Sequence, residues 1–494
     1  MDLTCSLDHE SGMDRRTAQA RSWILWLLPD LALFASIVTF GFCLLLFDGT
    51  RQLFRDSDSG WHIRTGEAIL AGAGLPRTES YSLLRSGQPW FAWEWASDAA
   101  MGAAHQAGGL PGVALLFALV IAACTWLWFQ LQWTAGGNFL IACLFAIPML
   151  STVNMHWLAR PHVFSWLFLL GLMFFLEKER QEFSIMDALL AFGFTALWAN
   201  MHASFFFAPV LCALYAISYW LRPLIWRLDR ESEWARAQWI AALAACSLAG
   251  SFINPYGWQL HGHVIHYLFN KELLDRVGEF QSFNFHAAGA SQILLVVGLS
   301  AIGGVLAFSQ KKLAHALTAA LLLAMALRSA RALPLLALLL LPLANASITR
   351  ALASCEDLQP RLQTAIRDFL AYSRNLRILD RKFSGALLLA PLLLLAVACL
   401  RLPAVEAHAG FPQDEFPVVA SFAVAKLPLE ARLLAPDKFG GYLIYRFNGA
   451  RKVFFDGRSD FYGSDYMKEY LNLIEVRPGW QAQVAKAGFT HALL

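Results

Sequence analysis

Residues 55–70 read RDSDSGWHIRTGEAIL, a dense polar stretch that begins just after the first long apolar run of the chain, near 23–47. An acidic pair, one residue apart, is followed within this stretch by an aromatic residue, a histidine, an arginine and a glutamate. Charged groups placed directly after an apolar run lie near one end of a helix. The arrangement of the apolar runs therefore decides how this cluster is interpreted.

Composition places the chain in the membrane class. Its 494 residues are 57% hydrophobic and only 15% charged, whereas about a quarter of the residues of a soluble domain are charged. The apolar residues form blocks of roughly 15 to 22, long enough to cross a hydrocarbon layer as helices. We predict an all-α polytopic membrane protein with about eleven spans, near 23–47, 110–131, 138–154, 161–177, 185–200, 203–221, 237–253, 290–308, 313–328, 332–348 and 384–402. The fifth and sixth, separated only by NMHAS, could instead form one broken helix.

Lysine and arginine predict the orientation, because loops on the cytoplasmic side carry an excess of both. With the N-terminus inside, nearly all strongly basic loops fall on one side of the membrane: 177–183, 222–238, 309–313 and 350–382. We therefore expect a cytoplasmic segment 1–22, a transmembrane domain 23–403 and an extracytoplasmic domain 404–494, in a bacterial inner membrane. The net charge of +3 arises from loop residues, and no nucleic-acid partner is expected.

The polar motifs all fall on the outer side. The first outer loop, 48–109, also falls there, although it is basic and is therefore the one exception to the charge rule. The motifs are RDSDSGWH (55–62), NMHWLARPH (154–162), WANMHAS (198–204), NPYGWQLHGHVIH (254–266) and LRSARALP (327–334). Polar groups that are costly in a membrane gather at one depth when they line one cavity. The sequence thus predicts an outward-facing cavity.

Two outer segments have their own expected structure. The loop 48–109 is expected to form two short amphipathic helices on the membrane surface, with Trp90, Trp93 and Trp95 at the interface. Residues 404–494 alternate β-type runs with Gly and Asn turns and also contain helical stretches, which predicts a small α/β domain. This domain could continue beyond residue 494. No cysteine lies well inside an outer loop, so no disulfide framework is expected.

The acidic pair is the candidate catalytic group. Asp56 and Asp58 could act as a general base, or bind a divalent cation such as Mg²⁺ or Mn²⁺ with Glu94. The alternative is that Asp56 caps a helix and Asp58 is merely solvated. The other expected substrate-binding residues are those of the outer motifs: Trp61, His62, Glu94, Arg160, His162, Asn200, His202, Arg328 and Arg331.

Two of these residues, Arg328 and Arg331, are three apart and therefore expected on one helix face. Charges kept outside against the positive-inside trend suit a phosphate or pyrophosphate, which arginine binds bidentately. The alternative is a structural ion pair with an acidic outer group.

The motif DSDSGWHIR (56–64) resembles the acidic first-loop motif of GT-C membrane glycosyltransferases, a class that includes oligosaccharyltransferase catalytic subunits. WANMH, NPYG and DGRSDFY are similar to motifs of bacterial GT-C-like proteins with a C-terminal outer domain. The resemblance implies a GT-C-like fold and a polyprenyl-phosphate sugar donor used outside the membrane. It also implies that Asp56 or Asp58 is the base or metal-binding acid, and that Arg328 and Arg331 bind the donor phosphate. The outer domain lacks the WWD-type acceptor motif of the oligosaccharyltransferases, which argues against a peptide acceptor.

The expected activity is therefore transfer of a hexose or pentose, with inversion, to a lipid, glycan or protein acceptor. Two alternatives remain open. A lipid-linked glycan transporter or flippase would place polar groups near mid-membrane in paired halves, and a polysaccharide ligase or polymerase could use another fold.

Overall fold

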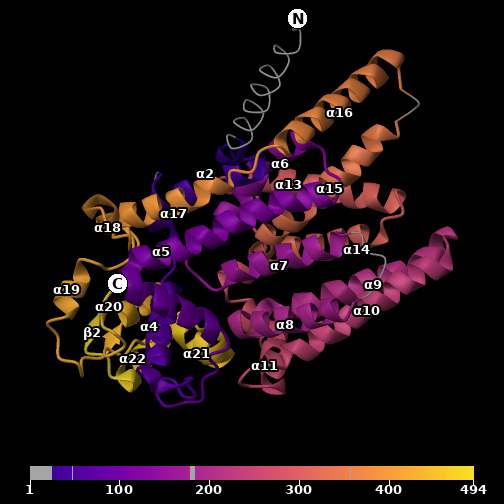
Figure 1. Ribbon diagram of the computed structural model, residues 1–494. Coiled ribbons are helices and arrows are strands. Elements are labelled where there is room, and N and C mark those ends of the chain that lie inside the picture. The colour runs from indigo at the N-terminus through magenta and orange to yellow at the C-terminus, as the bar shows by residue number, and fades with distance from the viewer. Residues whose placement is uncertain (1–24, 47, 179–183, 356–357) are drawn as a thin grey trace, which may run out of the picture.

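The structure is a computed structural model that describes residues 25–46, 48–178, 184–355 and 358–494. The predicted cytoplasmic segment 1–22 and most of the basic loop 177–183 lie outside the described residues. Long helices run side by side in a bundle, and the first loop and the C-terminal part gather together at one end of it (Figure 1).

The bundle and its loops contain most of the helices. In chain order these are α2 (Leu31–Leu44), α3 (Thr50–Leu53), α4 (Asp58–Ala68), η1 (Ile69–Ala73), α5 (Trp95–Thr134), α6 (Phe139–Asn154), α7 (His162–Glu177), α8 (Ile185–Met201), η2 (Ala203–Phe206), α9 (Phe207–Trp226), α10 (Arg230–Ser251), α11 (Trp258–Phe269), α12 (Lys271–Leu274), η3 (Gly278–Phe280), α13 (Ala290–Ser309), α14 (Leu313–Arg328), η4 (Ala330–Ala332), α15 (Leu333–Ala353), α16 (Pro360–Asp380) and α17 (Ala386–Leu400). The C-terminal part contains α18 (Pro403–His408), α19 (Ala420–Val424), β1 (Leu433–Leu434), α20 (Asp437–Arg446), α21 (Ser459–Ile474), α22 (Trp480–Ala487) and β2 (His491–Ala492).

Each of the eleven predicted spans contains a helix. Four described helices are long and apolar enough to cross a membrane, α5, η2–α9, α13 and η4–α15, and six shorter ones are apolar, α2, α6, α7, α8, α14 and α17. α10 belongs to neither group, because charged residues occupy its first two turns. The protein is thus a helical membrane protein, whereas the span count of eleven and the orientation stay predictions.

Local sequence explains where several spans begin. Asp30 accepts a hydrogen bond from the backbone N–H of Leu33 and starts α2, and Asn138 does the same for α6. Such caps satisfy the free N–H groups of the first helical turn. Between α8 and α9, His202 has extended backbone angles. The two therefore form separate helices rather than a continuous one.

Burial separates the centre of the bundle from its lipid-facing side. Helix α15 is buried on nearly every side from Leu333 to Ser347 and forms the axis of the core. By contrast, Ala396 and Leu400 are the buried residues of α17. The exposed leucines of such an apolar helix are suited to contact lipid.

The first loop, 48–109, does not form the predicted pair of helices on a membrane surface. Helix α4 is packed between α5 and α20, and Trp61 and Trp90 are buried in the core. The second predicted helix begins at Trp95 and continues into the following span, with a kink at Gly108 and Gly109. Amphipathic spacing alone does not distinguish a face buried against protein from one buried in lipid, and here protein covers it.

The C-terminal part contains less β-structure than predicted. Its sheet consists of two residues from each strand, β1 and β2, paired in parallel. The stretch 437–446, expected to be a turn and a strand, is helix α20. Its glycines are used for close packing: a β-carbon on Gly441 would lie 2.1 Å from the carbonyl oxygen of Ser57 in the loop before α4. A glycine pair that resembled a turn thus allows the C-terminal part to touch the first loop.

Candidate active site

A cavity of about 950 Å³ opens where the ends of α7, α9, α14 and α15 meet the first loop and the C-terminal part. Ten of the eleven predicted site residues line it: Asp56, Asp58, Trp61, His62, Glu94, Arg160, His162, His202, Arg328 and Arg331. The prediction that the polar motifs share one cavity is therefore supported by their positions.

Asn200 is the exception, because it does not line this cavity. Its amide oxygen accepts a hydrogen bond from the indole N–H of Trp95 at 2.8 Å. Its amide nitrogen donates to the carbonyl oxygens of Ala196 and Ile253, each at 2.7 Å. The contacts with Trp95 and Ile253 join α8 to α5 and to the segment after α10, whereas the contact with Ala196 lies within α8. Asn200 therefore connects neighbouring segments of the bundle.

Arg160 connects the acidic groups at one side of the cavity. Its guanidinium lies 2.7 Å from Asp56 Oδ2, 2.9 Å from Asp58 Oδ2 and 3.2 Å from Glu279 Oε1. Asp56 also accepts a hydrogen bond from the backbone N–H of Asp58 at 2.8 Å. The N-cap of α4 is Ser57, so Asp56 is not the cap itself, although its side chain satisfies the first backbone N–H of the helix.

Asp58 has the environment of a general base. Burial is the largest influence and raises its pKa, Arg160 opposes this, and Asp56 and Asp456 raise it further, to about 7. A carboxylate with a pKa near the working pH can accept a proton and still be ionised when needed. The idea that Asp58 is solvated is wrong, since it is only 5% exposed.

A second chain of polar groups begins beside Asp58. The Nδ1 atom of His62 lies 2.5 Å from Asp98 Oδ1, and its Nε2 atom lies 3.7 Å from Glu94 Oε2. The other oxygen of Glu94 lies 3.3 Å from His202 Nε2. Burial raises the pKa of Glu94 to about 8 and lowers the pKa of His62 well below its usual value. These groups can pass or hold a proton in the wall of the cavity.

The proposed metal pair, Asp58 and Glu94, does not fit a resident divalent cation. Within the described part of the chain, no group of three or more His, Cys, Asp or Glu side chains could hold a metal ion. The Asp58 carboxylate is paired with Arg160 instead, and Glu94 faces two histidines. The guanidinium supplies positive charge at the position where a cation would be needed.

The two candidate phosphate-binding arginines differ from each other. Arg328 is the last residue of α14, whereas Arg331 follows in the turn η4, so the prediction that both lie on one helix face was wrong. Arg331 pairs with Glu279 Oε2 at 3.3 Å, as the ion-pair alternative anticipated. Arg328 is exposed to the cavity, and no described carboxylate pairs with it. Of the two arginines, Arg328 is therefore the one more available to bind an anion.

Sequence reasoning missed the contribution of the C-terminal segment DGRSD (456–460). Arg458 is buried and pairs with Asp456 at 2.7 Å and with Glu79 at 2.9 Å, which joins this segment to the first loop. Its Nη1 atom is buried without a hydrogen-bond partner among the described residues. In the sequence this motif supports only a family resemblance, because nothing in its local pattern indicates that it folds back onto Asp58.

The lack of a side chain at Gly457 lets the DGRSD segment pack closely against Asp58, the candidate base. A β-carbon at this position would lie 2.0 Å from Asp58 Oδ1. We therefore expect Gly457→Ala to displace the carboxylate and to lower the activity of the site at least tenfold. Gly262→Ala on α11, a helical position without a positive φ where nothing lies within 4 Å of the added carbon, is the control for yield and thermal stability. Full activity of Gly457→Ala would mean that the position of this carboxylate is unimportant.

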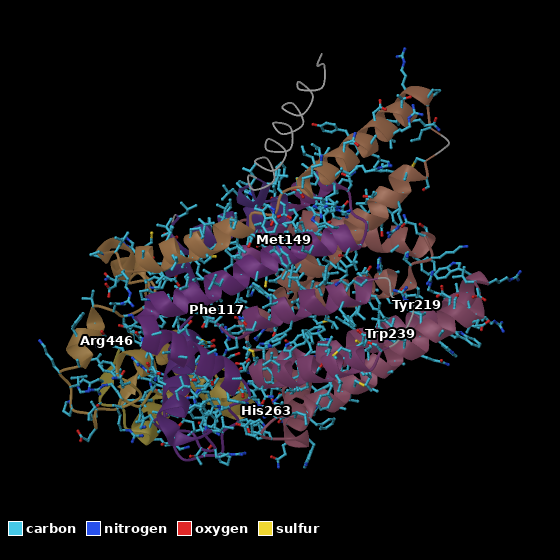
Figure 2. The ribbon with its side chains drawn as sticks, viewed as in Figure 1. Phe117, Met149, Tyr219, Trp239, His263 and Arg446 are labelled. Atoms are coloured by element: carbon cyan, nitrogen blue, oxygen red, sulfur yellow. The ribbon has the colours of Figure 1, made fainter. Side chains whose placement is uncertain are left out.

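Aromatic side chains, Trp93 and Tyr267 among them, also line the cavity, and His263 and Phe91 pack next to them. His263 stacks on Phe91 with ring centroids 4.9 Å apart and contacts Asp460 at 3.2 Å. Trp93 packs edge-on against His263 and against Tyr267. His263 lies at the end of the bundle that carries the C-terminal part (Figure 2). Flat apolar rings beside hydrogen-bonding groups are suited to a ligand with both an apolar and a hydroxylated face.

The fold has a known counterpart. The apo crystal structure of the Archaeoglobus fulgidus oligosaccharyltransferase matches with a TM-score of 0.52 and 10% identity, covering 93% of this chain and 68% of that chain. At such low identity the likeness concerns the fold, which is GT-C-like, as the first-loop motif implied. No known family model and no curated protein sequence matches this chain.

Proposed function

We propose that the protein is a membrane glycosyltransferase that moves a sugar from a polyprenyl-phosphate-linked donor to an acceptor within the cavity. The observation that carries this proposal is that one cavity holds both Asp58, a carboxylate with a pKa near 7, and Arg328, which pairs with no carboxylate of the described residues. Sugar transfer needs both a base and a group that neutralises the leaving phosphate. The GT-C-like fold adds support.

The proposed reaction assigns each group one task. Asp58 accepts the proton of an acceptor hydroxyl, whose oxygen forms a bond to the anomeric carbon. The bond between that carbon and the phosphate oxygen breaks, and the phosphate leaves with the electron pair. Arg328, and Arg331 beside it, stabilise the charge on that phosphate, while Arg160 positions the Asp58 carboxylate. Attack opposite the leaving group inverts the anomeric carbon.

The neighbourhood of the cavity is suited to a lipid-linked donor. Helix α11 exposes an apolar stripe in which Trp258 is 70%, Ile265 57% and Phe269 82% exposed. Phe269 also lines the cavity. An apolar edge at the cavity mouth lets a prenyl chain stay in lipid while its phosphate reaches the arginines.

The arginines provide the test. For Arg328→Lys we expect roughly ten- to a hundredfold weaker binding of a polyprenyl phosphate, because an ammonium keeps the charge but loses the bidentate fork. Arg401→Lys, an exposed residue that does not line the cavity, is the matched control. The measurement is the dissociation constant of the purified, monodisperse variants.

Arg331→Lys separates donor binding from structure. If Arg331 serves only its pair with Glu279, this variant should lower protein yield and leave donor affinity normal. Unchanged donor affinity in monodisperse Arg328→Lys would remove Arg328 from the phosphate site and refute the role given to it here.

A further inference from the structure

A second cavity, of about 510 Å³, lies at the other end of the bundle. Helices α7, α9, α14 and α15 contribute to both cavities, each with its opposite ends. A helix of the length of α7 separates its two ends by roughly 24 Å. Tyr219, which lines the second cavity, lies far from His263 in Figure 2. This second cavity, called the basic pocket below, is therefore separate from the candidate active site.

Positive charge dominates the basic pocket. Its described lining residues with charged or imidazole side chains are Lys178, Arg222, Arg236, Lys312, Arg350, Glu177 and His315. The carboxylate of Glu177 is already engaged, since it lies 3.0 Å from His315 Nε2 and accepts a hydrogen bond from Tyr215. Arg222 pairs with Glu233 at 2.7 Å. No described carboxylate pairs with Arg236, Lys312 or Arg350.

The arginines of the pocket are held in place by their neighbours. Arg236 lies over the Tyr219 ring at 4.6 Å. Its Nε atom is buried without a hydrogen-bond partner among the described residues. Arg350 donates to Gln310 Oε1 at 2.8 Å and to Ser347 Oγ at 3.2 Å. A buried donor without a partner is costly, so an acceptor that fills the pocket would be favoured.

We propose that the basic pocket binds a phosphate group, either the headgroup phosphate of an anionic lipid or inorganic phosphate. Fixed guanidinium groups match phosphate oxygens in pairs, and an ammonium adds a mobile positive charge. Basic pockets between membrane helices are typical sites for anionic headgroups. The adjoining surface of α9 is apolar, with Trp220 52% and Leu224 48% exposed, which would accommodate lipid chains beside the phosphate.

The test measures ligand-dependent thermal stability of the purified full-length protein in detergent micelles. Phosphatidylglycerol is compared with phosphatidylcholine, and inorganic phosphate with chloride at equal ionic strength. We expect phosphatidylglycerol or inorganic phosphate to raise the melting temperature. The double variant Arg236→Gln/Lys312→Gln should need at least about tenfold more of that ligand. The effective ligand identifies the source of the phosphate.

The control is Arg374→Gln, which removes a charge from an exposed position on α16 outside the pocket and should respond like the wild type. If the double variant is not monodisperse, Lys312→Gln alone serves, because Lys312 is exposed. The proposal is overturned if neither ligand stabilises the wild type, or if the pocket variants respond as the wild type does. It is equally overturned if Arg374→Gln loses the response to the same extent.

Discussion

Asp58→Asn is expected to reduce sugar transfer by about 10²- to 10⁴-fold, the usual contribution of a general base. In the wild type the transfer rate should rise with pH and level off above the Asp58 pKa of about 7, because only the ionised carboxylate accepts a proton. The amide cannot do so, and the variant should lose this rise. Initial rates with a panel of polyprenyl-phosphate sugars, measured across pH, provide the readout.

The fold should survive this substitution. The folded-state pKa of Asp58 is raised above its unfolded value of 3.8. Its stabilising contribution is therefore complete below that value and is lost as the pH rises through about 7. At pH 8 the substitution removes an ionised carboxylate whose burial is unfavourable. Arg160 still has its ion pairs with Asp56 and Glu279. The melting temperature at pH 8 should thus be unchanged or higher.

Asp48→Asn is the matched control, since Asp48 belongs to the same loop but is exposed, pairs with Arg55 and does not line the cavity. It should keep the wild-type rate. Wild-type turnover of Asp58→Asn would show that another group is the base, and Glu94 would be the next residue to test.

Arg160→Met is expected to have the largest effect on stability, about 3–5 kcal/mol, because removing one partner of a buried ion pair leaves charge uncompensated. Three carboxylates, Asp56, Asp58 and Glu279, surround this guanidinium. Without it the three carboxylates would repel one another. The yield of monodisperse protein and its melting temperature are the measurements.

The pH dependence of Arg160→Met distinguishes charge from packing. Arg160 and Arg331 keep the pKa of Glu279 at about 2 despite burial, so losing Arg160 should raise the pKa of this carboxyl. The variant should therefore recover stability as the pH falls and the carboxylates take up protons. Arg401→Met controls for loss of an exposed arginine. A melting temperature equal to that of the wild type at pH 8 would contradict the central position given to Arg160.

The location of the site could be predicted from the sequence because membrane helices fix it. Apolar runs determine which residues lie at helix ends, and polar motifs at the same end of several spans converge on one cavity. Ten predicted residues do line it. Asn200 does not line it, and sequence could not show this because a helix-end amide has the same local pattern whether it faces a cavity or a neighbouring helix.

Other parts depend on contacts that sequence patterns do not report. Glu279 meets Arg160, and Arg458 meets Glu79 of the first loop, only through tertiary packing. Each lies in a segment with no periodic signal. Helix α20 was misread because a Gly–Gly pair predicts a turn unless a close neighbour is known. Arg331 does not share a helix face with Arg328, because the backbone is extended at Ser329 and ends the helix there.

The most direct test of the central claim is a structure of the protein determined with a polyprenyl phosphate. The account predicts density for the phosphate within hydrogen-bonding distance of Arg328, in the cavity lined by Asp58, with the prenyl chain leaving past Phe269. A phosphate found only in the basic pocket, or no lipid density in the larger cavity at saturating ligand, would contradict it.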